Sequence, residues 1–197
     1  ADKGEFSHFM LKEIYEQPNA IKKTIEELMK DTLPFNISEK ILSKLQRIII
    51  VACGTSWHAG LVGEYIIEKF SHIPVEVEYA SEFRYRNPVI DKGTLIIAIS
   101  QSGETADTNA AVKEAKKKGA FIFSICNVFG SSLTRMSNLV VYTKAGPEIG
   151  VASTKAFTTQ LSVLYLFSLF LAKFNKKLSP KEIEKKSEIL KGVPQKI

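Results

Sequence analysis

Short apolar runs alternate with amphipathic stretches along most of the chain. The runs are rich in Ile, Val, Phe and Tyr, as is typical of β-strands, and they lie at 47–53, 75–79, 94–100, 120–126 and 139–143. Four of them are almost continuously apolar, which is expected of strands covered on both faces in a parallel sheet. The run at 75–79, VEVEY, alternates between apolar and polar residues, so it indicates a strand at the edge of the sheet.

Amphipathic segments with helical spacing separate these runs. They predict helices at 56–71, 81–87, 104–119 and 131–137, with a longer one at about 154–173. Strands and helices that alternate in this way predict an α/β fold, built on a doubly wound, five-stranded parallel sheet with right-handed crossovers.

The residues before the first strand predict an N-terminal helical arm. Apolar residues at 8–30 have helical spacing, but Pro18 and Asn19 interrupt them, so we expect two short helices there. Ser38 is placed to cap another short helix just before the first strand.

Composition and charge narrow the class of protein. The chain has 197 residues, of which 45% are hydrophobic, and this suits one globular domain with a substantial core. The formal net charge is +6, but acidic and basic residues are interleaved, so we expect solvated helix faces rather than a nucleic-acid-binding groove. The longest basic run, at 116–118, lies at the end of a predicted helix, where cations favour the negative pole of the helix dipole.

Cysteine usage and hydropathy predict a cytoplasmic protein. Cys53 and Cys126 each lie at the end of an apolar run, where a free thiol behaves as a small hydrophobe, and two cysteines are no disulfide framework. The opening ADKGEF has no features of an export signal. The apolar stretch at 161–174 is shorter than the roughly 20 residues that cross a bilayer, so we expect a buried core helix and no membrane association.

Polar residues follow the first, third and fifth predicted strands, at the edge of a parallel sheet where ligands bind. The third strand runs into SQSGET, in which Gly103 allows close backbone approach and the side-chain donors are Ser100, Gln101, Ser102 and Thr105. With the backbone N–H groups of the next helix, these neutral donors suit a phosphate. A simple helix cap by Ser102 is the alternative, but it needs only one hydroxyl. The segment matches neither a nucleotide P-loop nor a dinucleotide fingerprint.

The other two loops repeat this chemistry. Thr55 and Ser56 follow the first strand, and Ser153 follows a Gly-containing turn after the fifth, with Val151 placed to offer backbone groups to a sugar. We expect His58 to be a packed or surface residue of its helix rather than an acid or base. The His residues have no Cys, Asp or Glu partners at metal-ligand spacing, so we expect no metal and no other cofactor.

Five segments resemble one known family: CGTS, ASEFRYR, SQSGETADT, ICNVFGSSLTR and EIGVASTKAFTTQ are similar to the isomerase region of the glutamine–fructose-6-phosphate aminotransferases. SQSGET alone marks only the wider sugar isomerase (SIS) fold, which has flavodoxin-like topology. The resemblance implies a helical arm at 1–44, a first SIS domain at 45–190, and at 191–197 the start of a linker to a second SIS domain.

The resemblance also implies which residues meet the substrate. The phosphate would be bound by Ser100, Gln101, Ser102 and Thr105, and the sugar approached by Thr55, Ser56, Val151 and Ser153. In the family a glutaminase domain supplies ammonia, and the second SIS domain supplies the proton-transfer residues, one of them from a neighbouring subunit. We therefore expect a homodimer, no catalytic residue in this chain, and little or no activity from it alone.

Two other functions stay open at this stage. One is a sugar-phosphate sensor that regulates transcription, although residues 1–40 show no helix-turn-helix pattern. The other is a single-domain phosphosugar isomerase, for which His58 is the residue to test because Glu104 and Glu148 are poor candidates for the base. Arg84 and Arg86, beside aromatic residues, indicate either cation–π packing at a subunit contact or a solvated helix face.

Overall fold

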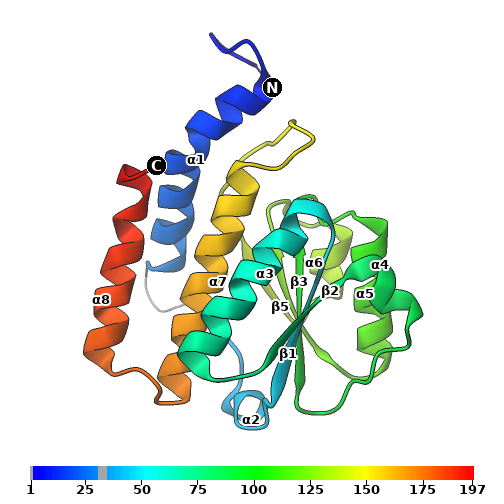
Figure 1. The fold of residues 1–197 in the computed structure, drawn as a ribbon. Coiled ribbons are helices and arrows are strands. Elements are labelled where there is room, and N and C mark those ends of the chain that lie inside the picture. The colour runs from blue at the N-terminus through cyan, green and yellow to red at the C-terminus, as the bar shows by residue number, and fades with distance from the viewer. Residues whose placement is uncertain (1, 31–34) are drawn as a thin grey trace.

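The protein is described here by a computed structural model that covers residues 2–30 and 35–197. Five parallel strands form its central sheet in the order β2-β1-β3-β4-β5, which confirms the predicted doubly wound α/β fold with flavodoxin-like strand order (Figure 1). The strands are β1 (Arg47–Ala52), β2 (Val75–Tyr79), β3 (Thr94–Ser100), β4 (Phe121–Cys126) and β5 (Leu139–Tyr142).

Helices cover both faces of the sheet. They are α1 (Phe9–Leu28), α2 (Glu39–Leu42), α3 (Gly54–Ser71), α4 (Ala80–Tyr85), α5 (Ala106–Lys117), α6 (Ser132–Met136), α7 (Lys155–Phe174), α8 (Pro180–Lys191) and the 3₁₀ helix η1 (Val193–Gln195). Side chains of β1 alternate between two buried clusters: Ile48 and Ile50 pack with α1, α3 and α7, whereas Ile49 and Val51 pack with α4, α5 and α6. This two-sided burial explains the continuous apolar runs.

The alternating strand lies where its pattern predicted. β2 pairs only with β1 and forms one edge of the sheet, and its residues are less buried than those of the central strands. The helix predictions are confirmed to within a few residues at most ends, and Ser38 precedes α2 although its side chain makes no capping hydrogen bond.

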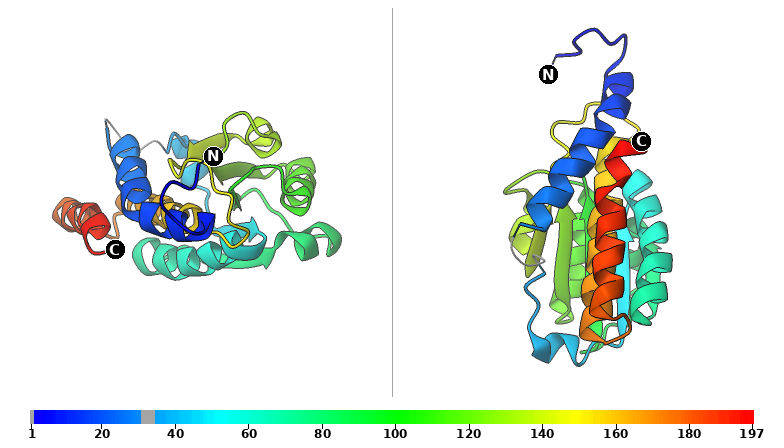
Figure 2. Two further views of the ribbon diagram at one scale, coloured as in Figure 1. Left: turned by 90° about the horizontal axis from the view of Figure 1, so that it is seen from above. Right: turned by 90° about the vertical axis from the view of Figure 1, so that its left-hand side faces the viewer.

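The prediction of two short N-terminal helices is wrong. Residues 9–28 form one helix, with Pro18 inside it. Proline removes one backbone donor, but the Gln17 side-chain amide donates to the Ile14 carbonyl, which that donor would otherwise serve (3.1 Å). Packing of α1 against α7 also stabilises the continuous helix (Figure 2). Tertiary packing therefore outweighs the local break.

The helix α7 has 20 residues and is therefore longer than the apolar stretch at 161–174, from which a core helix is predicted. By length and composition it could cross a membrane, but 61% of its most apolar stretch is buried inside the protein. There α7 contacts α1, α3 and α8. The expectation of a core helix is therefore supported by its burial. The predicted linker, 191–197, contains η1, which packs against α1.

Candidate functional site

The loops after β1, β3 and β5 lie together at the carboxyl edge of the sheet (Figure 1). β1 and β3 are the two strands between which the strand order reverses, and their register pairs Ala52 with Ile99. The first two loops therefore leave the sheet side by side at the position where such folds bind ligands. The third returns through α7, where the Gln160 amide donates to the Ser56 hydroxyl (3.0 Å).

Residues 100–105, named here the β3–α5 turn, are shaped by their own hydrogen bonds. The buried Ser100 Oγ accepts from the Gly103 N–H (2.9 Å) and lies 3.2 Å from the Thr105 Oγ1. Gly103 has φ = +68°, and a Cβ there would lie 2.0 Å from the Ser131 Oγ. The glycine is therefore required by packing within the protein, a reason that sequence reasoning missed when it assigned Gly103 to ligand approach.

Several side-chain donors around the turn are left without an acceptor. The Ser102 Oγ accepts from the Glu104 N–H (3.2 Å), so its own proton remains available. Within the described residues, the Gln101 amide and the Thr55 hydroxyl form no hydrogen bond. Ser56 only accepts, from Gln160. The structure thus gathers neutral donors from two loops at one edge.

The helix starts at this edge fall into two classes. No side chain caps α3, which follows Cys53, or α5, which follows Thr105, so their first backbone N–H groups remain unpaired. The alternative in which Ser102 caps α5 is wrong, because the helix begins at Ala106 and Thr105 is at its N-cap position. By contrast, the carboxylates of Glu104 and Glu148 accept hydrogen bonds from backbone N–H groups at the starts of α6 and α7. Of the uncapped helices at this edge, α3 and α5 start beside the predicted phosphate site, and α4 starts after the edge strand β2.

Glu104 lies in the β3–α5 turn, but its carboxylate caps the start of α6. Its carboxylate accepts from the Ser132 N–H (2.8 Å), and this backbone hydrogen bond is the main reason that the pKa of Glu104 lies below its usual value, with the Ser132 hydroxyl and Arg135 contributing further. A carboxylate held in its ionised form by these donors is a poor proton acceptor at neutral pH. The expectation that Glu104 is not the catalytic base stays consistent with this geometry.

Glu148 likewise caps a helix, α7. It lies in residues 143–154, named here the β5–α7 loop. Its carboxylate accepts from the backbone N–H groups of Thr154 (2.9 Å) and Ala156 (3.1 Å) and from the Ser153 hydroxyl (2.8 Å). Ser153 therefore lies at the site edge with its proton already donated, while Val151, two residues earlier, is fully exposed. Sequence reasoning missed this cap, because its residue spacing matches no local capping pattern.

Two other residues considered in the sequence, His58 and Arg84, contact other residues of the protein. The His58 Nδ1 lies 3.1 Å from the Gly54 carbonyl and its ring contacts Trp57 edge-on, so the surface-residue interpretation is supported. Arg84 packs over the Tyr85 ring and pairs with Asp107 (3.0 Å). Across the described ranges 2–30 and 35–197, no group of three or more His, Cys, Asp or Glu side chains could hold a metal.

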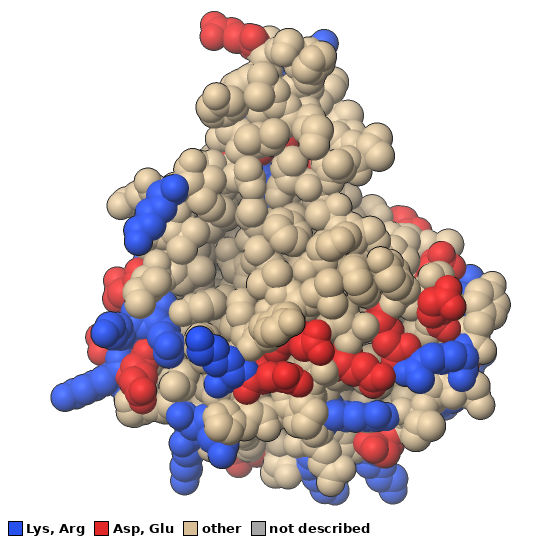
Figure 3. Space-filling model, viewed as in Figure 1, with Lys and Arg blue, Asp and Glu red and all other residues tan. Residues whose placement is uncertain are grey.

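On the face that contains α3, most charged side chains lie away from these loops. Figure 3 shows Lys, Arg, Asp and Glu gathered mainly toward the lower end of this face, with a further group on the α4 side. A hollow of about 560 Å³ adjoins the turn at Gln101, and its other lining residues include Phe129, Tyr142 and Lys144. Neutral donors beside a hollow suit a polar ligand that brings its own negative charge.

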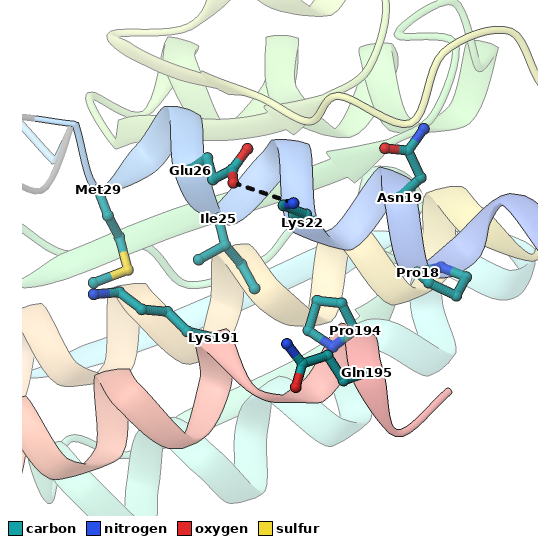
Figure 4. A pocket seen from close by; sticks show the side chains of 9 residues that line it. All are labelled: Pro18, Asn19, Lys22, Ile25, Glu26, Met29, Lys191, Pro194 and Gln195. Atoms are coloured by element: carbon teal, nitrogen blue, oxygen red, sulfur yellow. Dashed lines mark ion pairs between the residues drawn. The ribbon is translucent and has the colours of Figure 1, made fainter.

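A second hollow, of about 440 Å³, lies beside α1. It is enclosed by α1 and the C-terminal residues, and Figure 4 shows Pro194 and Gln195 facing Ile25, with the ion pair of Lys22 and Glu26 at its rim. It includes none of the predicted site residues. Its size therefore adds nothing to the assignment of the site.

Comparisons with known proteins bear on this site. The profile of the SIS domain family matches residues 41–169. All of the chain aligns with the glutamine–fructose-6-phosphate aminotransferase [isomerizing] of Clostridium tetani, at 54% identity over 201 residues, and with that of Caldanaerobacter subterraneus subsp. tengcongensis, at 54% over 205 residues. The chain spans only about a third, 33%, of the length of each of these curated relatives.

A solved structure agrees with the sequence relatives. The C-terminal domain of glucosamine-fructose-6-phosphate aminotransferase from Francisella tularensis is similar, with a TM-score of 0.92 and 47% identity. The similarity covers 99% of this chain and 56% of that one.

Proposed function

The chain belongs to the SIS domain family, and we propose that within it the chain is the sugar-phosphate-binding half of the isomerase region of a glutamine–fructose-6-phosphate aminotransferase. The full-length enzyme would convert fructose 6-phosphate and glutamine-derived ammonia to glucosamine 6-phosphate. The similarity over the whole chain to enzymes named for this reaction supports the assignment.

The observation that supports binding most directly is the pairing of neutral donors with uncapped helix starts. A phosphate at the β3–α5 turn would receive hydrogen bonds from Gln101, Ser102 and the first N–H groups of α5, while Ser100 and Thr105 hold the turn in shape and complete the cradle. The sugar would then lie toward the side chains and backbone of Thr55, Ser56, Val151 and Ser153.

Proton transfer between sugar carbons would come from outside this chain. It requires an acid or base free to exchange a proton. The two carboxylates near the site, Glu104 and Glu148, are both engaged in capping helices. We therefore propose that the chain binds and orients substrate, and that a second SIS domain, a glutaminase domain and a partner subunit of a cytoplasmic homodimer complete the enzyme.

The two alternatives receive less support. A transcriptional sensor would need a DNA-binding unit, and residues 9–28 instead form one helix packed on α7. A self-sufficient isomerase would need a proton-transfer residue such as His58, whose ring is bonded to its own helix.

Calorimetric titration tests the proposal. Fructose 6-phosphate, glucosamine 6-phosphate and inorganic phosphate would each be titrated into the chain, and we expect all three to bind with competition among them. Because the phosphate provides the shared contacts, Ser102→Ala should weaken all three, by about 0.5–1.5 kcal/mol each. Absence of binding at millimolar concentration, or rapid isomerisation of fructose 6-phosphate by the chain alone, would contradict the proposal.

A further inference from the structure

A buried carboxylate on α1 reaches across to the β5–α7 loop. Glu13 is only 2% exposed, and its carboxylate oxygens accept hydrogen bonds from the backbone N–H groups of Ile149 (2.6 Å) and Gly150 (3.1 and 3.2 Å). None of the ion pairs found within residues 2–30 and 35–197 includes Glu13. A buried carboxylate is costly unless hydrogen bonds satisfy it, so these two amides are its stabilising partners.

Two more residues of α1 hold the ends of the same loop. The Thr24 hydroxyl accepts from the Lys144 N–H at the start of the loop (3.0 Å). The Glu16 carboxylate pairs with the buried Lys155 ammonium at its end (2.6 Å). Glu13, Glu16 and Thr24 are three and eight residues apart and so project from one face of the helix. One face of α1 thus contacts the start, the tip and the end of the loop.

The tip passes close to α1. A Cβ built on Gly150 would lie 2.7 Å from the Glu13 Oε2 and 3.6 Å from the Met10 Cα, so the loop has little room to shift toward the helix. Val151 follows immediately and is fully exposed, and Ser153 lies two residues further on. Two of the four residues proposed to meet the sugar, Val151 and Ser153, therefore directly follow the segment that Glu13 anchors.

We propose that Glu13 is a positioning residue for sugar recognition, acting through the amides of Ile149 and Gly150 on the segment that presents Val151 and Ser153. This inference rests on the proposed function, because the sugar contacts of those two residues belong to it. It also assigns a role to the N-terminal arm: α1 lies outside the residues 41–169 that define the family match, yet it shapes one side of the site.

Three variants test the role of Glu13. Glu13→Ala removes both acceptors, and Glu13→Gln keeps one oxygen but turns an N–H₂ toward the loop. Glu26→Ala is the matched control, because Glu26 lies on the same helix, is exposed and pairs with Lys22 rather than with the β5–α7 loop. Hydrogen exchange at the amides of Ile149 and Gly150 reports the anchor directly. We expect exchange about tenfold or more faster in Glu13→Ala, a smaller change in Glu13→Gln, and none in the control.

Binding measurements then separate positioning from general stability. Glu13→Ala should weaken fructose 6-phosphate about fivefold to tenfold while inorganic phosphate changes less than about twofold, because the β3–α5 turn is untouched. Unchanged amide protection, unchanged sugar-phosphate affinity, or an equal loss for both ligands would overturn the inference. If Glu13→Ala does not fold, the same comparison is made with Glu13→Gln. Failure of the unaltered chain to bind either ligand would instead overturn the proposed function, and with it the role in recognition.

Discussion

The β3–α5 turn and the β5–α7 loop lie at the same edge of the sheet but are held in different ways. The turn is fixed by its own groups, since Ser100 accepts from the Gly103 N–H three residues on. The loop is fixed by carboxylates, one from within it, Glu148, and one from Glu13, which is 136 residues away from Ile149 in the sequence. A short self-contained turn suits one compact anion, whereas a long loop needs outside support to present a fixed surface.

This difference shows where rigidity in the site comes from. In the turn, a single buried hydroxyl and one left-handed glycine set the backbone, so small changes there should be severe. In the loop the stabilising contacts are spread over both ends and the tip, so the loss of one should leave the others.

Gly103→Ala should have the largest effect, because it combines backbone strain with overlap. The new Cβ would lie 2.0 Å from the Ser131 Oγ and 2.8 Å from the Cys126 Sγ. We expect the free energy of unfolding, measured in urea, to fall by about 2–4 kcal/mol. Gly119→Ala is the matched control, since its φ is +83° but nothing lies within 4 Å, and it should lose about 1–2 kcal/mol. Equal losses would mean that packing against Ser131 contributes nothing.

Glu148→Ala should have an intermediate effect, because it uncaps α7. The backbone N–H groups of Thr154 and Ala156 lose their acceptor, and the free energy of unfolding should fall by about 1–2 kcal/mol. The comparison variant is Glu182→Ala, which removes the carboxylate of the exposed capping box of α8 and should cost less. A larger loss for Glu182→Ala would show that the loop does not depend on its own carboxylate.

Two serines of the turn should separate binding from stability. Ser102→Ala removes a hydroxyl whose proton is unused, so phosphate affinity should fall by about 0.5–1.5 kcal/mol while the unfolding midpoint stays nearly constant. Ser100→Ala leaves the buried Gly103 N–H without its acceptor, so stability should fall by about 1 kcal/mol and affinity with it. The reverse pattern, with Ser102 affecting stability and Ser100 only binding, would contradict the division of roles.

Much of the fold followed from local patterns. Continuous apolar strands and the alternating β2 gave the parallel sheet and its edge, because burial on one or two faces dictates side-chain polarity directly. The break expected at Pro18 did not occur, since its effect on α1 is offset by the Gln17 amide and by packing on α7. Neither of these compensations is visible from residue spacing.

The place of the candidate site, at the carboxyl edge of the sheet, could also be predicted from the sequence. Chemically distinctive loops at strand ends pointed to the carboxyl edge, where the structure also places them. The internal uses of Ser100 and Ser153, and the anchor from Glu13, depend on contacts between residues distant in sequence or on turn geometry. A residue type tells which hydrogen bonds a side chain can form, but the backbone path decides which of them it does form.

The smallest effect expected is a pH dependence from Glu104, the carboxylate of the turn that caps α6. Its pKa is lowered from the ordinary value of 4.5 chiefly by the Ser132 N–H, so its stabilising contribution is full above that unfolded-state value and is lost as pH falls through the folded-state pKa. The difference in unfolding midpoint between the unaltered chain and Glu104→Gln should therefore be constant above about pH 5.5 and shrink toward pH 3. Because other carboxyl groups are shared by both proteins, their titration cancels in this difference. A difference that stayed constant down to pH 3 would show that Ser132 does not favour the ionised form.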